Sequence, residues 1–288
     1  MPEGAPARLD ALLAARGLVK SRTAAVKLIQ AGRVSVDGVT AIKASAPVAG
    51  DALLAVDPED DWVSRAAHKL VGALDAFGVD PAGRIALDVG ASTGGFTQVL
   101  LDRGAERVIA LDVGHGQLDP RVAMDPRVVS VEGTNARSIT ADDVRAMDPA
   151  AARIDMVVGD LSFISLRLVL PALVDAVVDP FRARDLVLLV KPQFEVGRTG
   201  VREGIVHDAD LRNDAVMNVL WTAWDRGLGT VGVVPSPIVG THGNREFLVH
   251  LQPVDGHAHG EHEGASTGRP GPNPTEWIDR VTRMTEGT

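Results

Sequence analysis

The chain has 288 residues, 45% of them hydrophobic, and a net charge of −9 at neutral pH. That length is enough for one large domain and one small one. The absence of cysteine excludes disulfides, thiolate metal sites and cysteine nucleophiles. No apolar run reaches the length of a membrane span, about 18 residues, and residues 1–10 lack the apolar stretch of a signal peptide. We therefore expect a cytoplasmic protein that does not bind membranes.

The first 56 residues differ in charge from the rest of the chain. They carry seven basic and four acidic residues, a net charge of +3 on a chain that is acidic overall. The local charge matters more than the total for binding a polyanion. The basic residues of this segment are the predicted phosphate contacts: Arg8, Arg16, Lys20, Arg22, Lys27, Arg33 and Lys43.

Two short helices are predicted in this basic segment. The leucine spacing after Arg8 favours an amphipathic helix that Gly17 closes. Ser21 is placed to cap a second helix over residues 22–31, and Gly32 is placed to end it. Taken alone, this part of the pattern is also compatible with a solvated helical hairpin that carries ordinary surface charges.

A β-hairpin is predicted directly after the second helix. Residues 33–36 alternate as in a strand, and Asp37-Gly38 is a strong hairpin turn signal. The helices and hairpin together resemble the alpha-L RNA-binding module of a small-subunit ribosomal protein and of pseudouridine synthases. The resemblance implies a small α+β RNA-binding domain. The acidic, proline-containing stretch at residues 57–61 predicts a linker with a domain boundary near residue 60, so we assign residues 1–60 to this domain and its linker.

From residue 61 onward, strand-like and helix-like runs alternate. This order predicts an α/β fold with a doubly wound, Rossmann-like sheet over residues 61–253, whose ligands bind at the carboxyl ends of the strands. The last strand follows Pro235-Ser236-Pro237 and a glycine-rich turn, which favours an antiparallel edge strand. The seven predicted strands are 84–89, 107–111, 128–132, 154–159, 185–190, 230–234 and 245–251.

A glycine-rich loop lies between the first predicted strand of this sheet and the helix that follows it. The loop reads Asp88-Val89-Gly90-Ala91-Ser92-Thr93-Gly94-Gly95-Phe96. Small residues at such a turn let the backbone approach a ligand closely. Asp112 ends the next strand, 22 residues after Gly90, where an acid can accept hydrogen bonds from a ribose. These features predict a site for an adenosine-containing cofactor.

The spacing of the glycines favours S-adenosylmethionine over a dinucleotide. A dinucleotide loop usually reads G-x-G-x-x-G and seats a pyrophosphate on the helix N-terminus. Here the glycines are Gly90, Gly94 and Gly95, and Asp88 at the strand end can serve the amino-acid part of S-adenosylmethionine. The alternative is an ordinary strand-to-helix turn rich in small residues, which the register of Asp112 disfavours.

Four ionisable residues are predicted to converge near this loop. Asp160 and Lys191 each end an apolar strand, Glu246 begins the last strand, and Lys69 lies on the helix that enters the sheet. A lysine directly after five apolar strand residues is costly to leave unpaired, so Lys191 should meet an acid. For Lys191 alone, a structural ion pair with Asp160 is an equally good interpretation.

The motifs around these residues closely resemble the TlyA family of ribosomal-RNA ribose 2′-O-methyltransferases, whose members are also called haemolysins. The resemblance covers residues 7–251. It is carried by residues 65–70, by the glycine loop and by residues 112–118, 160–166 and 191–195. It implies S-adenosyl-L-methionine as cofactor, ribosomal RNA or ribosomal subunits as partner, and cytidine as the target nucleotide.

The resemblance also implies roles for individual residues. Lys69, Asp160, Lys191 and Glu246 correspond to the family's catalytic set, Asn135 lies near the adenine, and Arg65 joins the RNA contacts. The implied cofactor-binding residues are Asp88, Gly90, Ala91, Ser92, Thr93, Gly94, Gly95, Phe96, Asp112, Asn135 and Asp160. One departure is Asp60-Asp61 before Trp62, where the family often carries arginine; this concerns the coupling of the domains.

The chemistry of these residues is compatible with that role. A ribose hydroxyl is a poor nucleophile until its proton is removed or turned away. Lys191 can accept a proton only after losing its own, which Lys69 nearby favours and Asp160 opposes. We therefore expect Asp160 to hold the Lys191 ammonium, and Glu246 to orient Lys69 or the hydroxyl. In-line methyl transfer depends mainly on alignment, so no metal is expected.

Other functions find less support in the sequence. An amino-group methyltransferase would usually carry prolines after the fourth strand, where this chain has Asp160-Leu161-Ser162-Phe163. A methyltransferase that forms a cysteine adduct with a base is excluded. A membrane-lytic haemolysin would need a spanning run or a strongly basic amphipathic helix. A non-catalytic RNA-binding protein that keeps only the fold is a further alternative.

The C-terminal residues 254–288 are predicted to form a low-complexity, disordered tail. They are rich in Gly, His, Glu and Pro. His257, His259 and His262 lack the framing of a metal site, so no metal is predicted there. Within the tail, residues 276–281 have the composition of a short helix.

Overall fold

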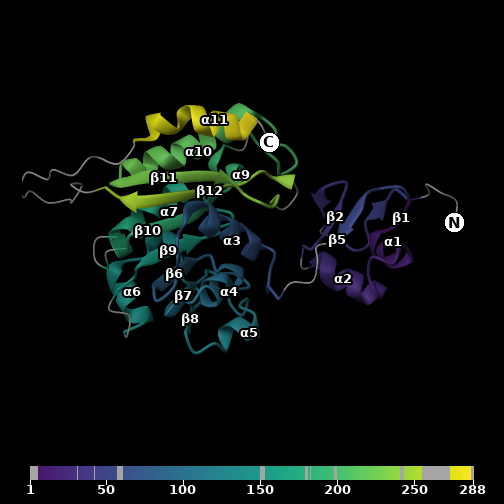
Figure 1. Cartoon of the computed structure of the whole chain (residues 1–288), viewed down its shortest axis with the longest axis horizontal. Helices are drawn as coiled ribbons and strands as arrows, with labels where there is room; N and C mark the ends of the chain where they lie inside the picture. Colours follow the sequence, from purple (N-terminus) through teal and green to yellow (C-terminus); the bar gives the residue numbers. More distant parts are fainter. Residues whose placement is uncertain are drawn as a thin grey trace, which may run out of the picture.

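The protein consists of a small N-terminal domain at one end and a large domain built around a seven-stranded sheet (Figure 1). The structure is a computed structural model. It describes residues 6–30, 32–41, 43–56, 61–149, 153–178, 181, 183–197, 200–240, 243–254 and 273–286. Of the predicted acidic linker, residues 57–60 lie outside this part of the chain.

The N-terminal domain packs two helices against short strands. Leu9 and Leu13 of the first helix meet Ala25 and Ile29 of the second in a core closed by Val34. The apolar residues recur at intervals of four because successive turns of a helix bring such positions onto one face. The elements are β1 (Ala7–Arg8), α1 (Leu9–Ala15), α2 (Arg22–Gln30), β2 (Val34–Val36), β3 (Val39–Thr40), β4 (Pro47–Val48) and β5 (Leu54–Val56).

The local signals of this domain have the structures that the sequence predicts. The Ser21 hydroxyl accepts a hydrogen bond from the Ala24 amide at 3.1 Å and so caps α2. Asp37 and Gly38, with φ of +51° and +81°, form the two-residue turn between β2 and β3. Asp and Gly tolerate positive φ well, which is why this dipeptide makes the hairpin turn.

The large domain contains the predicted doubly wound sheet. Its strand order is β11-β12-β10-β9-β6-β7-β8, and β10, β9, β6, β7 and β8 are parallel. The chain direction across the sheet switches between β6 and β9, and ligands bind at such a switch point. The strands are β6 (Ile85–Val89), β7 (Arg107–Leu111), β8 (Val128–Val131), β9 (Met156–Gly159), β10 (Asp185–Val190), β11 (Leu228–Pro235) and β12 (Phe247–Pro253).

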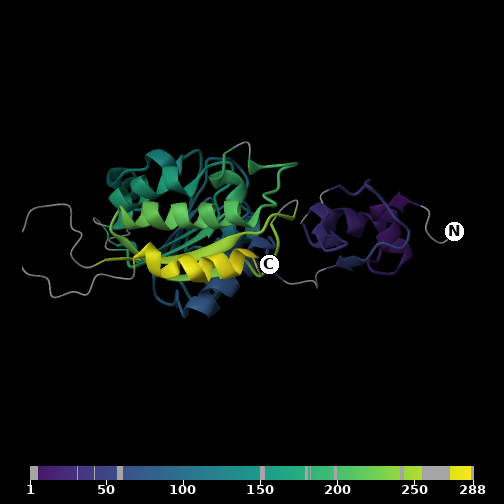
Figure 2. The same ribbon diagram turned by 90° about the horizontal axis from the view of Figure 1, so that it is seen from above.

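Helices cover both faces of this sheet. One core lies between the sheet and α3, α4 and α5, and the other lies between the sheet and α6, α7 and α10 (Figure 2). The helical elements are α3 (Ala66–Phe77), α4 (Gly95–Asp102), α5 (Pro120–Ala123), η1 (Ala136–Ser138), α6 (Ala141–Met147), α7 (Leu166–Leu173), η2 (Val174–Val178), α9 (Pro192–Glu195), α10 (Ala209–Trp224), η5 (Pro274–Trp277) and α11 (Ile278–Glu286).

The position of the last strand differs from the prediction. β12 is antiparallel, as expected, but it lies between β10 and β11, and β11 is the edge strand. The loop over residues 236–246 is therefore the connection of an antiparallel pair, and it brings the start of β12 to the carboxyl end of β10. Local patterning indicates direction and burial but not which neighbour a strand chooses.

The prediction of a disordered tail is wrong for residues 273–286, whereas the short helix predicted over residues 276–281 is present within η5 and α11. Helix α11 lies alongside α10 in both views (Figures 1 and 2), with its Val281, and Trp277 of the preceding η5, buried in the core. The buried Arg212 guanidinium donates to the Thr285 carbonyl at 2.8 Å. The spacing of these residues by four places them on one helix face, which explains the docking. The three histidines of the predicted tail lie outside the described residues.

Candidate active site

The loop after β6 makes close contact with the segment that follows β9. Gly90 has a φ of +83°, and a Cβ on it would lie 3.1 Å from the Asp160 carbonyl oxygen and 3.2 Å from the Leu161 side chain. A side chain at this position would be strained by the backbone angle and crowded by a main-chain atom. Glycine here lets two strand ends meet, which creates the site.

Gly94 and Gly95 are packed closely against other side chains of the protein. A Cβ on Gly95 would lie 2.3 Å from the Ser64 hydroxyl, and one on Gly94 would lie 2.8 Å from the Leu118 side chain. The sequence analysis predicted that both glycines let a cofactor approach the backbone closely. In the structure their nearest neighbours precede α3 and α5, so these glycines let both segments pack against the start of α4.

Two cavities, each of about 480 Å³, open at the carboxyl ends of the strands. We call them the interdomain cavity and the strand-end cavity. They share four residues: Gly90, Ser92, Asp160 and Ser162. The interdomain cavity is also lined by Gln30, Gly32, Thr40, Ser64, Arg65, Lys69, Ala91, Thr93, Gly95, Phe96 and Lys191. The strand-end cavity is also lined by Asp112, Val113, Gln117, Asn135, Leu161 and Phe163.

Asp112 and Asn135 are both positioned by backbone contacts at the strand-end cavity. Asp112 accepts hydrogen bonds from the Ser92 amide at 2.8 Å and from the Gly114 amide at 2.7 Å. The Asn135 side chain accepts from the Arg137 amide at 3.0 Å and caps η1. These bonds fix the two side chains in place on the cavity wall before any ligand is bound.

Asp88 lies below the loop and lines neither of these two cavities. Its carboxylate is completely buried and accepts a hydrogen bond from the Thr97 hydroxyl at 2.6 Å. Burial raises the pKa of Asp88 to about 7, against the effect of Thr97. The placement gives no support to a direct contact of Asp88 with an amino-acid moiety.

The raised pKa of Asp88 predicts a pH-dependent stability. The folded protein keeps this proton up to about pH 7, whereas the unfolded chain releases it near pH 4. Between these values the folded state binds more protons, so stability falls as pH rises through this window. The shift corresponds to about 4 kcal/mol of unfolding free energy.

Asp88→Asn should remove this contribution, because asparagine accepts from Thr97 without a charge. Urea unfolding of the cofactor-free protein between pH 4 and 8 should show a smaller loss of stability in this variant than in the parent. Asp142→Asn, at a carboxylate whose side chain is 93% exposed, is the control and should leave the slope unchanged. Equal slopes for all three proteins would show that Asp88 is not protonated in the folded state.

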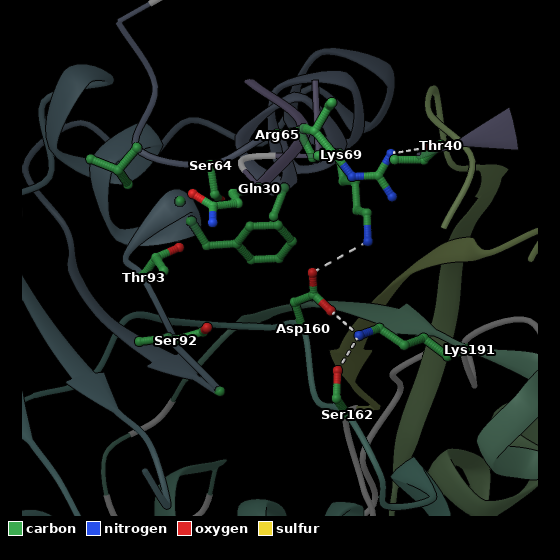
Figure 3. Close-up of a pocket in the computed structure, with 18 residues that line it drawn as sticks. Gln30, Thr40, Ser64, Arg65, Lys69, Ser92, Thr93, Asp160, Ser162 and Lys191 are labelled. Carbon is green, nitrogen blue, oxygen red and sulfur yellow. Dashed lines mark hydrogen bonds and ion pairs between the residues drawn. The ribbon is translucent and has the colours of Figure 1, made fainter. Parts of the chain in front are cut away.

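The four ionisable residues predicted to converge do meet. Asp160 lies between the two lysines (Figure 3): its carboxylate is 2.6 Å from Lys191 Nζ and 3.4 Å from Lys69 Nζ. Lys69 Nζ also donates to Glu246 Oε2 at 2.7 Å. The result is a buried, alternating chain of charges, Glu246, Lys69, Asp160 and Lys191.

The charges in this chain stabilise one another. Burial alone would lower the pKa of Lys69, but the Asp160 and Glu246 carboxylates outweigh it and the pKa is raised. Burial alone would raise the pKa of Asp160, but the two lysines outweigh it and the pKa is lowered. Lys69 is therefore a fixed cation and Asp160 a fixed anion at neutral pH, so Lys69 cannot serve as a base.

Two further residues of the site were not identified from the sequence. The Ser162 hydroxyl accepts a hydrogen bond from Lys191 Nζ at 2.6 Å. Phe163 is 91% exposed at the strand-end cavity and has a φ of +65°, an unfavourable angle for a bulky residue. The signal available in the sequence was a large apolar residue three positions after Asp160, in a segment without helix or strand periodicity.

Three of the predicted RNA contacts are engaged within the N-terminal domain. Arg8 and Arg22 both pair with Asp10, at 3.0 and 2.9 Å. Hydrogen bonding by Arg8, with the further charge of Arg22, holds the pKa of Asp10 well below its usual range. Arg16 donates to the Ala52 carbonyl at 2.6 Å. Part of the basic charge therefore stabilises the fold of this domain.

Arg65 connects the two domains. Its guanidinium donates to the Thr40 hydroxyl at 2.7 Å (Figure 3). The Arg65 side chain also packs over Gly32. This places it in the interdomain cavity, at the N-cap of α3 and four residues before Lys69. Arg33 is half-buried, and the exposed lysines of the N-terminal domain are Lys20, Lys27 and Lys43.

Neither membrane spans nor metal sites are found in the part of the chain that the structure describes. None of its helices has the length and hydropathy needed to cross a bilayer. No group of three or more His, Asp or Glu side chains there is arranged to hold a metal ion.

Comparison with known proteins identifies the family of both domains. Residues 62–253 match the FtsJ-like methyltransferase family, and residues 7–53 match the S4 domain. A Mycobacterium tuberculosis protein named 16S/23S rRNA (cytidine-2′-O)-methyltransferase TlyA is 51% identical, over 85% of this chain and 90% of that protein. Hemolysin A of Brachyspira hyodysenteriae is 38% identical, over 85% of this chain and 99% of that protein.

A solved structure shows the same likeness in three dimensions. A candidate hemolysin from Streptococcus thermophilus is 34% identical and superposes with a TM-score of 0.70, covering 98% of this chain and 96% of that one. The match spans both domains. The resemblance predicted from the motifs is confirmed, and the chain belongs to the TlyA family of FtsJ-like methyltransferases with an N-terminal S4 domain.

Proposed function

We propose that this protein transfers a methyl group from S-adenosylmethionine to the 2′-hydroxyl of a cytidine in ribosomal RNA, in the cytoplasm. The observation that carries the proposal is the buried Glu246–Lys69–Asp160–Lys191 chain at the rim of the glycine loop. The attached S4 domain and the 51% identical relative, named for this reaction on 16S and 23S rRNA, support the same substrate.

The strand-end cavity has the groups that S-adenosylmethionine requires. Asp112 offers a fixed carboxylate for ribose hydroxyls, and Asn135 offers an amide for the adenine. Gly90 brings the floor of the loop close to Asp160, at the boundary with the interdomain cavity. S-adenosylmethionine supplies an electrophilic methyl group on a sulfonium, and the chain's task is to hold and align both reactants.

Asp112→Ala should weaken S-adenosylmethionine binding by about 10- to 100-fold, because a charge-assisted hydrogen bond contributes about 1.5–3 kcal/mol. Isothermal titration calorimetry measures this directly. Glu132→Ala is the matched control: Glu132 also accepts a backbone amide hydrogen, from Gly116 at 2.8 Å, but it does not line the strand-end cavity. Unchanged affinity in Asp112→Ala would contradict the placement of the ribose.

Lys69 and Lys191 have different roles toward the ribose hydroxyl. Lys69 stays charged between two carboxylates, so it fixes Asp160 and adds positive potential near the reacting oxygen. Lys191 Nζ, which contacts Asp160 and Ser162, borders the interdomain cavity and is the group that meets the hydroxyl. Lys191 must first release one proton to solvent; as the new O–C bond then forms and the S–C bond breaks, the hydroxyl proton passes to the free amine of Lys191.

The proposed reaction can be tested directly. Purified protein should transfer labelled methyl from S-adenosylmethionine to ribosomal subunits taken from cells that lack the protein. Digestion to nucleosides should give 2′-O-methylcytidine as the labelled product. A base-methylated nucleoside, or RNA binding without any transfer to either subunit, would contradict the proposal.

A further inference from the structure

Glu195 joins the two segments that carry the polar groups of the site. Its Oε2 accepts a hydrogen bond from the Ser165 hydroxyl at 2.5 Å, and its Oε1 accepts one from the Leu166 amide at 2.7 Å. Burial raises the pKa of Glu195, and these two donors counteract that effect only in part. A partly buried carboxylate with both oxygens engaged at the N-terminus of α7 is a fixed contact.

The other end of the same helical turn carries Lys191. Lys191 is the N-cap of α9, and Glu195 is its last residue. Amides of Phe194 and Val196 donate to the carbonyls of Lys191 and Pro192 at 2.9 and 3.0 Å, so the turn is closed. Because the turn is short and hydrogen-bonded, fixing Glu195 also fixes the origin of the Lys191 side chain.

The opposing segment is strained and needs to be held at both ends. Phe163 adopts a φ of +65°, a strained angle for such a residue, which persists only where the surroundings enforce it. On one side, Ser162 is bonded to Lys191 at 2.6 Å. On the other side, Glu195 holds Ser165, and the rings of Phe163 and Phe194 lie 5.3 Å apart.

We propose that Glu195 is a positioning residue for methyl transfer: by clamping the start of α7 to α9, it keeps Ser162 and Asp160 at bonding distance from Lys191. The clamp lies outside the chain of charges, and among the described residues its polar partners are Ser165 and Leu166, not the Lys191 side chain. This inference rests on the proposed function, since its effect is measured on methyl transfer.

Three variants separate positioning from general stability. Glu195→Ala should lower kcat by at least about ten-fold, because small displacements of a reacting group are costly. Glu195→Gln can accept from the Leu166 amide through its oxygen and donate to the Ser165 hydroxyl oxygen through its nitrogen, so it should stay within about three-fold of the parent. Asp148→Ala removes another buried carboxylate, bonded to Arg107 at 2.8 Å at the opposite end of the strands, and should lower Tm but not kcat.

A double-mutant cycle and a crystal structure complete the test. Glu195→Ala combined with Ser162→Ala should be no worse than the more damaging single change, because both act through the placement of Lys191. In crystals of Glu195→Ala, Ser162 Oγ should move out of bonding distance of Lys191 Nζ. An inactive parent protein would overturn the proposed function. If the parent is active, the clamp would be overturned by full activity of Glu195→Ala, or by an unchanged 2.6 Å distance between Ser162 Oγ and Lys191 Nζ in crystals of that variant.

Discussion

Lys191→Ala is expected to reduce kcat for methyl transfer by at least about a hundred-fold, the usual scale for losing a positioned proton-transfer group. The physical reason is the position of Nζ, which is 2.6 Å from both Asp160 and Ser162 at the edge of the interdomain cavity. S-adenosylmethionine affinity should stay within about three-fold, because Lys191 does not line the strand-end cavity. Single-turnover assays with ribosomal subunits measure the rate, and calorimetry measures the affinity.

Lys191→Arg distinguishes the two roles that this lysine could have. Arginine keeps the positive charge beside Asp160 but does not give up its proton in proteins. If Lys191 accepts the hydroxyl proton, the arginine variant should be as slow as the alanine variant. If a cation is enough to orient the hydroxyl, arginine should restore a large part of the rate. Near-parental turnover in Lys191→Ala would instead make the Lys191–Asp160 pair structural.

Deleting residues 1–60 is expected to abolish methylation of ribosomal subunits while S-adenosylmethionine still binds. The strand-end cavity consists entirely of residues from the large domain, so its ligand should be unaffected. The basic charge lies in the N-terminal domain, on an otherwise acidic chain. Phosphate contacts supply most of the sequence-independent affinity for RNA, so removing them should remove binding. Filter binding and calorimetry on both proteins check the two halves of this expectation.

Point variants of the full chain test the same idea without exposing the domain interface. Replacing the exposed Lys20, Lys27 and Lys43 with alanine should weaken binding and flatten its dependence on salt, by about one in log–log slope for each phosphate that is no longer neutralised. The control removes the exposed Arg280 and Arg283 of α11, which lie outside the N-terminal domain. Equal affinities and slopes in the parent, the lysine variant and the control would contradict recruitment through the N-terminal domain.

The sequence by itself determined the features that depend on neighbouring residues. The Asp37-Gly38 turn, the Ser21 cap and the strand directions follow from local backbone preferences and periodicity. The site residues at strand ends could also be predicted, because a parallel sheet gathers the carboxyl ends of its strands at one edge. For this reason Asp160 and Lys191 were expected to meet, and they do.

Only the tertiary structure decided how deeply each charged group is buried and chose between the partners that the sequence left open. Lys69 and Glu246 pair across 177 residues because β12 inserts between β10 and β11, a choice that strand patterns do not encode. The sequence predicts that Asp88 contacts the cofactor, but in the structure its side chain is completely buried beneath the loop. α11 packs against α10 because Val281 on its apolar face is buried in the same core as the apolar residues of α10. Such long-range packing sets desolvation and Coulomb energy together, and these decide the charge state of a residue.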